Sequence, residues 1–249
     1  MTPSDQTVFE LETFGFTVLE SVIDAATAGG YSGTCAGLDA RHGTDYVHQE
    51  AYARHVMSVQ TLDRTLLDLA DHPAVLEVLE HFMGPQIILG SMNARNVRPG
   101  DPDQPLHSDV PPPLRKAGTA GTHPVMFNAV WMFDGFTETN GATRIVPGSH
   151  LAESAAPPDG LDVPWVAQPT GPPGSVLVFN GQCWHGGGAN RADHVRHAVF
   201  AHYRVSPWMR FQCDPHQGFP TEWWDDLRPR QRELLRMETG VGQPNSSDY

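Results

Sequence analysis

The sequence predicts a mainly β protein, a sandwich or barrel of short strands buttressed by helices near the N-terminus. Two observations support this class. The chain contains 24 Gly and 22 Pro among its 249 residues, a composition that favours strands and turns over a helical bundle. Apolar runs of strand length then follow one another, separated by turn sequences rich in Pro, Gly and Asn. We therefore expect one domain over residues 1–249, with its core at about 12–210 and a C-terminal extension at 211–249.

Helical signals gather before the strands, and they differ in strength. Residues 24–38 are rich in alanine, but Gly29 and Gly30 weaken a helix there. Residues 61–70 have a helical pattern of apolar positions. The clearest helix lies within 71–84, because this segment has an aspartate as N-cap, a proline in the first turn and a glycine past its end.

The predicted strands are apolar or alternating segments bounded by turn residues. An entry strand followed by a turn lies at 14–23, and further strands lie at 86–92 continuing through 93–98, and at 105–110, 125–133, 143–147, 175–180 and 195–205. The proline-rich stretch 151–173 is expected to form a surface loop. A short amphipathic helix is expected near 228–237. Helices followed by many short strands are typical of a β-sandwich or barrel, whose mouth binds ligands.

Charge and cysteine usage exclude several classes of protein. The net charge is −13, and Lys116 is the single lysine, so no basic block can follow a phosphate backbone or an acidic membrane surface. Cys35, Cys183 and Cys213 form no CxxC pair, which fits a reducing compartment. The N-terminus is acidic without an apolar core, and no apolar run reaches membrane-spanning length. We therefore expect a cytoplasmic protein that binds a small molecule, with neither nucleic acid nor membrane as partner.

A His-x-Asp pair suggests a metal site. His107 and Asp109 lie two residues apart in a predicted strand, so both side chains point to the same face. His185 follows the predicted strand 175–180 and opens a run of three glycines. Two histidines and one carboxylate suit non-haem iron(II) and leave coordination positions open. A His-x-Asp pair alone is more often a surface feature, so the interpretation depends on the residues around it.

A second signal is Arg196, on the next predicted strand after His185. A dicarboxylate that chelates a metal at one end needs a cation at the other, and arginine pairs bidentately with carboxylates. The alternative is that Arg196 is a surface residue paired with Asp193. His202 shares the inward face of the same strand; it either reaches the site or is a hydrogen-bonded core histidine.

Taken in order, these residues resemble the phytanoyl-CoA dioxygenase family. The matching motifs are Gln104-x-x-His107-x-Asp109, Asn140-Gly141-Ala142-Thr143, Pro147-Gly148-Ser149-His150, and Trp184-His185-Gly186 followed by Arg196. Asn96-Val97-Arg98-Pro99-Gly100 and Asp71-His72-Pro73 fit the family too. Each motif is weak alone, but the ordered set is specific, and the resemblance covers about residues 12–210.

The resemblance implies a double-stranded β-helix, or jelly-roll, fold that uses Fe(II), 2-oxoglutarate and O2. It makes His107, Asp109 and His185 the metal ligands and assigns Arg196 to the distal carboxylate of 2-oxoglutarate. It places four further residues along the co-substrate pocket: Asn96, Gln104, Thr143 and Trp131. The chain departs from the family at Gly187, where many relatives carry Ser or Thr as a second partner of that carboxylate. Thr143 is the expected substitute.

The implied function is a dioxygenase that oxidises a C–H bond of a small molecule and releases succinate and CO2. The outcome is hydroxylation, desaturation, epoxidation or cyclisation, and a part in secondary metabolism is expected. A CoA thioester is disfavoured, because one lysine and a net charge of −13 offer few phosphate contacts. The alternative is a jelly-roll protein that binds a metal or ligand without catalysis.

Overall fold

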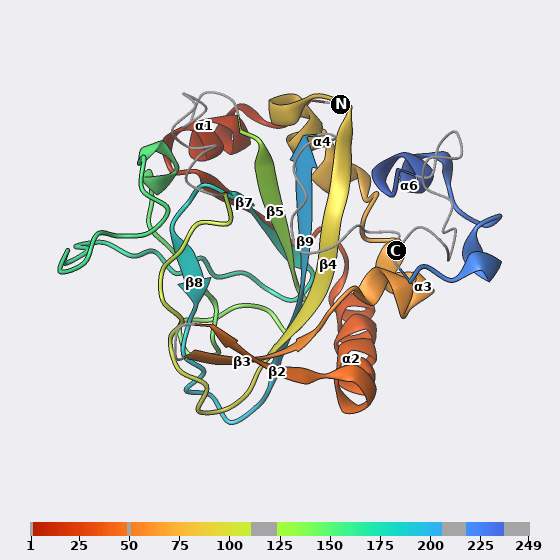
Figure 1. The fold of residues 1–249 in the computed structure, drawn as a ribbon, viewed down its shortest axis with the longest axis horizontal. Coiled ribbons are helices and arrows are strands. Elements are labelled where there is room, and N and C mark those ends of the chain that lie inside the picture. The colour runs from red at the N-terminus through yellow and green to blue at the C-terminus, as the bar shows by residue number, and fades with distance from the viewer. Residues whose placement is uncertain (1, 49–50, 111–123, 206–217, 237–249) are drawn as a thin grey trace.

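Seven antiparallel strands form the main sheet of the protein (Figure 1). The structure is a computed structural model, and it describes residues 2–48, 51–110, 124–205 and 218–236. Across the sheet the order is β1 (Phe16–Leu19), β7 (Ser175–Asn180), β5 (Met126–Met132), β9 (Arg196–Val205), β4 (Ile87–Val97), β3 (Ala51–Val56) and β2 (Thr44–His48). Strands from both halves of the chain therefore pair side by side, and β1 closes one edge against β7.

A second, smaller sheet lies against one face of the first. It consists of β6 (Thr143–Ile145) and β8 (His185–Gly187), and a single bridge between His107 and His185 adds a third segment. An apolar cluster that includes Val130 of β5 and Phe200 of β9 fills the space between the sheets. The candidate site lies in this same space. The two sheets confirm the predicted mainly β class.

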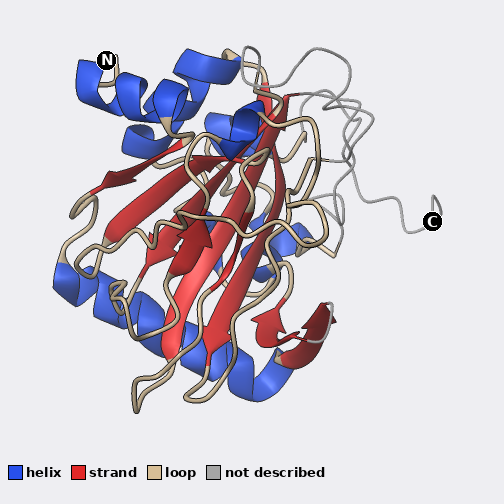
Figure 2. Cartoon of the chain, turned by 90° about the vertical axis from the view of Figure 1, so that its left-hand side faces the viewer, coloured by secondary structure: helices blue, strands red, loops and turns tan. Residues whose placement is uncertain are grey.

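Helices cover the other face of the main sheet (Figure 2). They are α1 (Asp5–Thr13), α2 (Ala25–His42), α3 (Arg64–Leu67), α4 (Pro73–Met83) and α6 (Pro229–Leu234), with short 3-10 turns at Val59–Thr61, Ser149–Leu151 and Thr221–Trp223. Alternate strand residues such as Phe127 and Trp131 pack on this helical layer, while Asn128 and Val130 point to the smaller sheet. Because both faces of β5 are buried, its sequence is almost continuously apolar.

The prediction that glycines weaken a helix at 24–38 is wrong. Helix α2 runs unbroken over Ala25–His42, and Gly29 and Gly30 lie on its exposed side. Cys35 and Leu38, on the other side, are buried against the sheet. Packing of one apolar face therefore outweighs the low helix propensity of glycine.

The strand predicted at 105–110 is also wrong. This segment forms only the isolated bridge at His107, followed by a bend at Asp109. It is nevertheless extended alongside β8, because His107 and His185 exchange backbone hydrogen bonds of 2.9 and 2.8 Å. His107 and Asp109 therefore lie on an extended segment beside β8 and not on the regular strand that was predicted.

Other elements differ in extent. Residues 61–70 contain only the four-residue α3, and α4 begins after His72 in place of the predicted aspartate cap. The segment 14–23, expected to be an entry strand followed by a turn, forms β1 and then a turn, as predicted. Strands β2, β3 and β8 were not predicted, and the C-terminal helix is shorter than 228–237.

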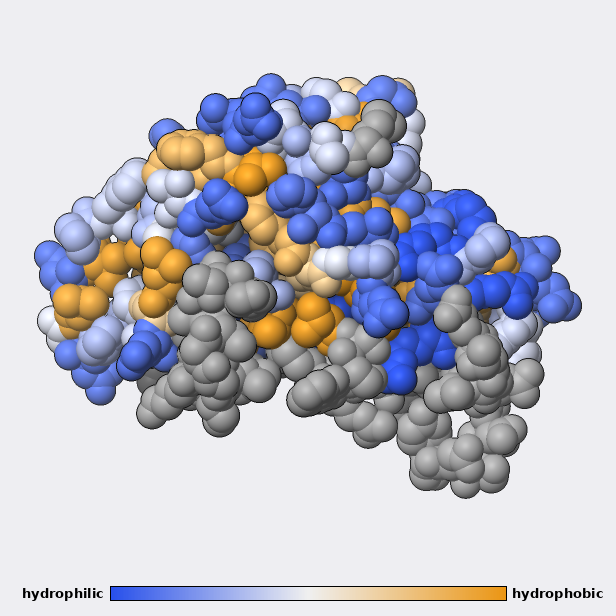
Figure 3. Space-filling model, turned by 90° about the horizontal axis from the view of Figure 1, so that it is seen from above, coloured by the Kyte–Doolittle hydropathy of each residue, from blue (hydrophilic) through white to orange (hydrophobic). Residues whose placement is uncertain are grey.

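Ion pairs attach α6 to the helical layer. Arg228 contacts Asp71 at 2.5 Å and Arg230 contacts Glu80 at 2.7 Å. Figure 3 shows this end of the molecule, on the right, as mainly hydrophilic.

Among the described residues, no helix is both long and apolar enough to span a bilayer.

Candidate active site

His107, Asp109 and His185 converge between the two sheets. One potential ligand atom from each lies within 4.8 Å of the others. The carboxylate lies near both imidazoles, with Asp109 Oδ2 3.5 Å from His185 Nε2 and Oδ1 3.8 Å from His107 Nε2. The backbone of Asp109 is held by its N–H, which donates to the Gly181 carbonyl at 3.0 Å. The three groups form one cluster suited to a divalent metal.

Backbone carbonyls orient both imidazoles. His107 Nδ1 lies 3.1 Å from the Pro105 carbonyl, and His185 Nδ1 lies 3.0 Å from the Cys183 carbonyl. A carbonyl can only accept, so each Nδ1 carries the proton and each Nε2 presents a lone pair toward Asp109. Fixing the tautomer through the other ring nitrogen is how proteins prepare histidine for metal binding.

Electrostatics keep these groups in their metal-binding protonation states. Burial lowers the pKa of His107 to about 4, with His185 adding to the shift, and burial likewise lowers the pKa of His185. Burial alone would raise the pKa of Asp109, but His185, His202, His107 and a hydrogen bond from Asn128 outweigh it and hold that pKa at about 2. At neutral pH the cluster therefore offers two neutral imidazoles and one carboxylate.

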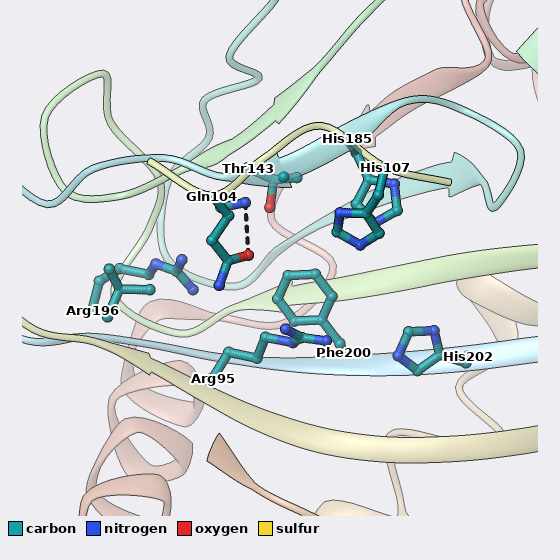
Figure 4. Close-up of a pocket in the computed structure, with 11 residues that line it drawn as sticks. Arg95, Gln104, His107, Thr143, His185, Arg196, Phe200 and His202 are labelled. Carbon is teal, nitrogen blue, oxygen red and sulfur yellow. Dashed lines mark hydrogen bonds between the residues drawn. The ribbon is translucent and has the colours of Figure 1, made fainter. Parts of the chain in front are cut away.

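Arg196 occupies the opposite end of the pocket (Figure 4). It is 1% exposed. One of its terminal nitrogens donates to the Gly141 carbonyl at 2.6 Å, and its guanidinium lies 4.4 Å from the centre of the Phe136 ring. Its Nε and Nη1 have no hydrogen-bond partner among the described residues. Burial lowers the pKa of Arg196 to about 9, so it remains a cation at neutral pH.

The alternative pairing of Arg196 with Asp193 is not found. The Asp193 side chain is fully exposed and contacts His194 at 3.1 Å. No ion pair involves Arg196 in the described part of the chain. A buried cation that lacks an acid is costly unless a ligand anion completes it.

Gln104 and Thr143 line the pocket between its two ends, together with Phe200 (Figure 4). Gln104 Oε1 accepts a hydrogen bond from the Gly187 backbone at 3.1 Å, which directs its amide nitrogen away from Gly187. The buried Thr143 hydroxyl has no hydrogen-bond partner in the residues described. Gly187 itself leaves room for Gln104, because a Cβ there would lie 3.0 Å from Gln104 Oε1.

The structure does not bring Asn96 and Trp131 to this pocket. The side chains of Arg95 and Val97 line it, so Asn96 between them lies on the other face of β4. Trp131 packs in the helix-side core, with its ring 5.3 Å from that of His72. Family resemblance placed both residues at the co-substrate, and strand alternation places them behind the sheet.

Two residues near the site were not predicted. Arg95 lines the pocket and lies 4.8 Å from the centre of the Phe200 ring. Asn128 donates to Asp109 Oδ2 at 2.7 Å. The available signals were a polar residue within the apolar run 125–133 and the alternation of 93–98. His202, for which two interpretations were open, lines the pocket and is also hydrogen-bonded to Asn128.

Comparison with known families settles the relationship. The family described as phytanoyl-CoA dioxygenase (PhyH) matches residues 11–198. The chain belongs to this family. It is 28% identical over 193 residues to dioxygenase af480 of Aspergillus fumigatus, covering 73% of this chain and 58% of that protein. It is 36% identical over 163 residues to dioxygenase trt7 of Aspergillus terreus, covering 64% and 53%. The chain thus spans little more than half the length of these two curated relatives.

Solved structures support the jelly-roll fold. The epimerase SnoN from nogalamycin biosynthesis superposes with a TM-score of 0.66 at 19% identity, covering 80% of this chain and 81% of SnoN. EctD from S. alaskensis superposes with a TM-score of 0.67 at 16% identity, covering 86% and 85%. The jelly-roll expectation for this phytanoyl-CoA dioxygenase family member is confirmed.

Proposed function

We propose that the chain is an Fe(II)- and 2-oxoglutarate-dependent dioxygenase that oxidises a C–H bond of a small molecule. The observation that carries this proposal is Arg196. Its buried guanidinium has two nitrogens without described partners, and it faces the His107–Asp109–His185 cluster across one pocket. A dicarboxylate bound between them would meet a cation at each end, which is the arrangement 2-oxoglutarate requires.

The residues present fit iron(II). Two imidazole nitrogens and a carboxylate form the donor set associated with non-haem iron oxygenases, and both imidazoles are held with Nε2 available. His107, Asp109 and His185 would hold the metal. When bound, iron(II) supplies the activation of dioxygen that accompanies oxidative decarboxylation of 2-oxoglutarate.

The other pocket residues bind and orient the co-substrate. Arg196 would pair with the distal carboxylate, and the buried Thr143 hydroxyl would donate the second hydrogen bond that a side chain at position 187 gives in relatives. The apolar cluster around Val130 and Ile145 keeps water out of the space next to these polar groups. A dry pocket strengthens each charge-assisted contact. No side-chain general base is needed, and we assign none.

The relatives point the same way. The curated relatives are named dioxygenases. SnoN is described as alpha-ketoglutarate dependent and was solved in complex with Fe3+, alpha ketoglutarate and nogalamycin RO. Its place in nogalamycin biosynthesis supports a free secondary metabolite as the class of substrate for this chain. Hydroxylation, desaturation, epoxidation and ring formation are all compatible with the site.

A non-catalytic jelly-roll protein that binds a metal or ligand is the competing function. Metal binding alone gives no reason for a buried Arg196 at the far end of the pocket with no acidic partner among the described residues. Catalytic and binding functions separate in a single assay, because a binding protein consumes no 2-oxoglutarate.

The test is oxygen uptake and succinate release with Fe(II) and 2-oxoglutarate across a metabolite library. We expect succinate formation that a chelator abolishes and that His185→Ala reduces to background. His194→Ala is the matched control, because the exposed side chain of this histidine contacts the exposed Asp193 and not the pocket. Equal succinate formation in the chelated, metal-free sample would refute the proposal.

A further inference from the structure

Asn128 is a polar residue where the sequence is otherwise apolar. It lies in the middle of the main sheet on β5, fully buried, opposite Phe179 of β7 and His202 of β9. Its side chain points toward the smaller sheet, as those of Val130 and Met132 do. A buried amide costs free energy unless its donors and acceptor are satisfied.

Both ends of this amide are engaged by groups at the site. Asn128 Nδ2 donates to Asp109 Oδ2 at 2.7 Å, and Oδ1 accepts from His202 Nδ1. The orientation of the amide is determined, since a carboxylate can only accept a hydrogen bond. It follows that the oxygen faces His202 and that His202 carries its proton on Nδ1.

The Asp109 carboxylate is held by a side chain, whereas both imidazole ligands are held by the backbone. The imidazoles of His107 and His185 are each oriented by a backbone carbonyl. Asp109 lies in a bend outside any strand. Asn128 is the only side-chain hydrogen-bond donor that the described residues provide to its carboxylate.

We infer that Asn128 is a positioning residue for the metal ligand Asp109 and that His202 holds Asn128 in the required orientation. The inference rests on the proposed function, because it requires that the His107–Asp109–His185 cluster binds a metal. Asn128 engages Oδ2 and leaves Oδ1, on the side of His107, for a metal. His202 acts one step further away, through the amide.

The test is calorimetric titration of Ni(II) into the chelator-treated full chain, without co-substrate or turnover. Asn128→Leu keeps the branched shape and removes both hydrogen bonds. We expect it to weaken Ni(II) binding by roughly 10–100-fold, the usual effect of losing a partner of a metal ligand. The matched control is Asn93→Leu, because Asn93 is equally buried and bonds Ser58 and Ser91, neither of which is a candidate metal ligand. This control should lose a similar amount of thermal stability and keep its Ni(II) affinity.

His202 provides a second, independent pair of variants that leaves Asn128 in place. His202→Asn retains a donor toward Asn128 Oδ1 and should bind Ni(II) like the unmodified chain, whereas His202→Leu should bind more weakly. Unchanged affinity in Asn128→Leu, or equal losses in Asn128→Leu and Asn93→Leu, would overturn the inference. If Asn128→Leu does not fold, equal affinity of the two His202 variants overturns it. Absence of Ni(II) binding by the unmodified chain would instead contradict the proposed metal centre itself.

Discussion

At the scale of single residues, Arg196 is the feature that most constrains function. Its guanidinium is buried, charged and paired with no acid in the described structure. The Gly141 carbonyl and the Phe136 ring neutralise none of its charge. A carboxylate ligand would satisfy the remaining nitrogens bidentately, so the residue is prepared for one.

Replacement of Arg196 by Ala should therefore raise the KM for 2-oxoglutarate strongly. Removing one partner of a buried charge pair costs about 2–5 kcal/mol, and the loss falls on co-substrate binding. Arg191→Ala is the matched control, because Arg191 lies on the exposed surface of the loop before β9. Steady-state succinate formation at varied 2-oxoglutarate measures both. An unchanged KM in Arg196→Ala would mean that another residue holds the co-substrate.

Gly187 supports a prediction that runs against the family pattern. The family resemblance implies that many relatives carry Ser or Thr here, yet Gly187→Ser should weaken 2-oxoglutarate binding in this chain. A Cβ at 187 would lie 3.0 Å from Gln104 Oε1 and 3.1 Å from its Cδ, so Gln104 must shift by a few tenths of an ångström, which disturbs its hydrogen bond to the Gly187 backbone. Overpacking of this kind costs about 1–3 kcal/mol. Tighter binding of 2-oxoglutarate by the serine variant would show that Gln104 yields without loss.

At the scale of elements, the turn that leads into β7 is tightly constrained. Gly174 has a φ of +89°, which only glycine adopts readily. A Cβ there would lie 2.0 Å from the Ile23 carbonyl, and Ile23 N donates to the Gly174 carbonyl at 3.1 Å. This turn joins the segment after β1 to the strand beside it.

Gly174→Ala should accordingly destabilise the protein by at least about 2 kcal/mol, through unfavourable φ and overlap with backbone. Gly29→Ala in α2 is the opposite case, since a Cβ added at Gly29 would meet nothing within 4 Å and the helix is regular there. It should stabilise by about 0.5–1 kcal/mol. Urea unfolding of both variants measures the contrast, and equal behaviour of the two would contradict the account of these glycines.

The central strands could be predicted from sequence because their composition is unambiguous. The predicted segments 86–98, 125–133, 175–180 and 195–205 correspond closely to β4, β5, β7 and β9. β8 could not, since His185–Gly187 is glycine-rich and forms a strand only through its partners β6 and His107. Helix α2 was underestimated for a related reason, because its stability comes from packing on the sheet.

The candidate site also has a part that residue types predict and a part that depends on how the strands pair. The His-x-Asp pair, His185 and Arg196 carry chemistry that their residue types alone suggest, and the fold brings them to one pocket. Trp131 was assigned by resemblance, but which face of β5 it occupies depends on register with β7 and β9. A shift of one residue exchanges the faces of a strand, so the sequence alone does not show that Asn128 faces the site and Trp131 faces the helices.

At the scale of the whole molecule, buried neutral histidines couple stability to pH. Burial lowers the pKa of His55 to about 2 and those of His107 and His202 to about 4, from an ordinary value of 6.5. The unfolded chain therefore binds more protons than the folded chain below pH 6.5. Stability is full above that pH and falls as the pH drops toward 4.

Each of these histidines should contribute a slope of up to about 1.4 kcal/mol per pH unit in this window. Urea unfolding of the chelator-treated protein at pH 7.0 and at pH 5.0 would measure the sum. We expect markedly lower stability at the lower pH, and a partial recovery when Ni(II) is present, because a bound metal favours the neutral imidazoles. Equal stability at the two pH values would show that these histidines are accessible to protons in the folded protein.

The whole architecture places the His107–Asp109–His185 cluster and a buried cation at opposite ends of one pocket between two sheets. The most direct test of this account is calorimetric binding of 2-oxoglutarate to the full chain without oxygen, with and without Ni(II). We predict binding that is at least about tenfold tighter with the metal, since both ends of the dicarboxylate are then engaged. Equal affinity with and without Ni(II), or no binding in either case, would contradict the central claim.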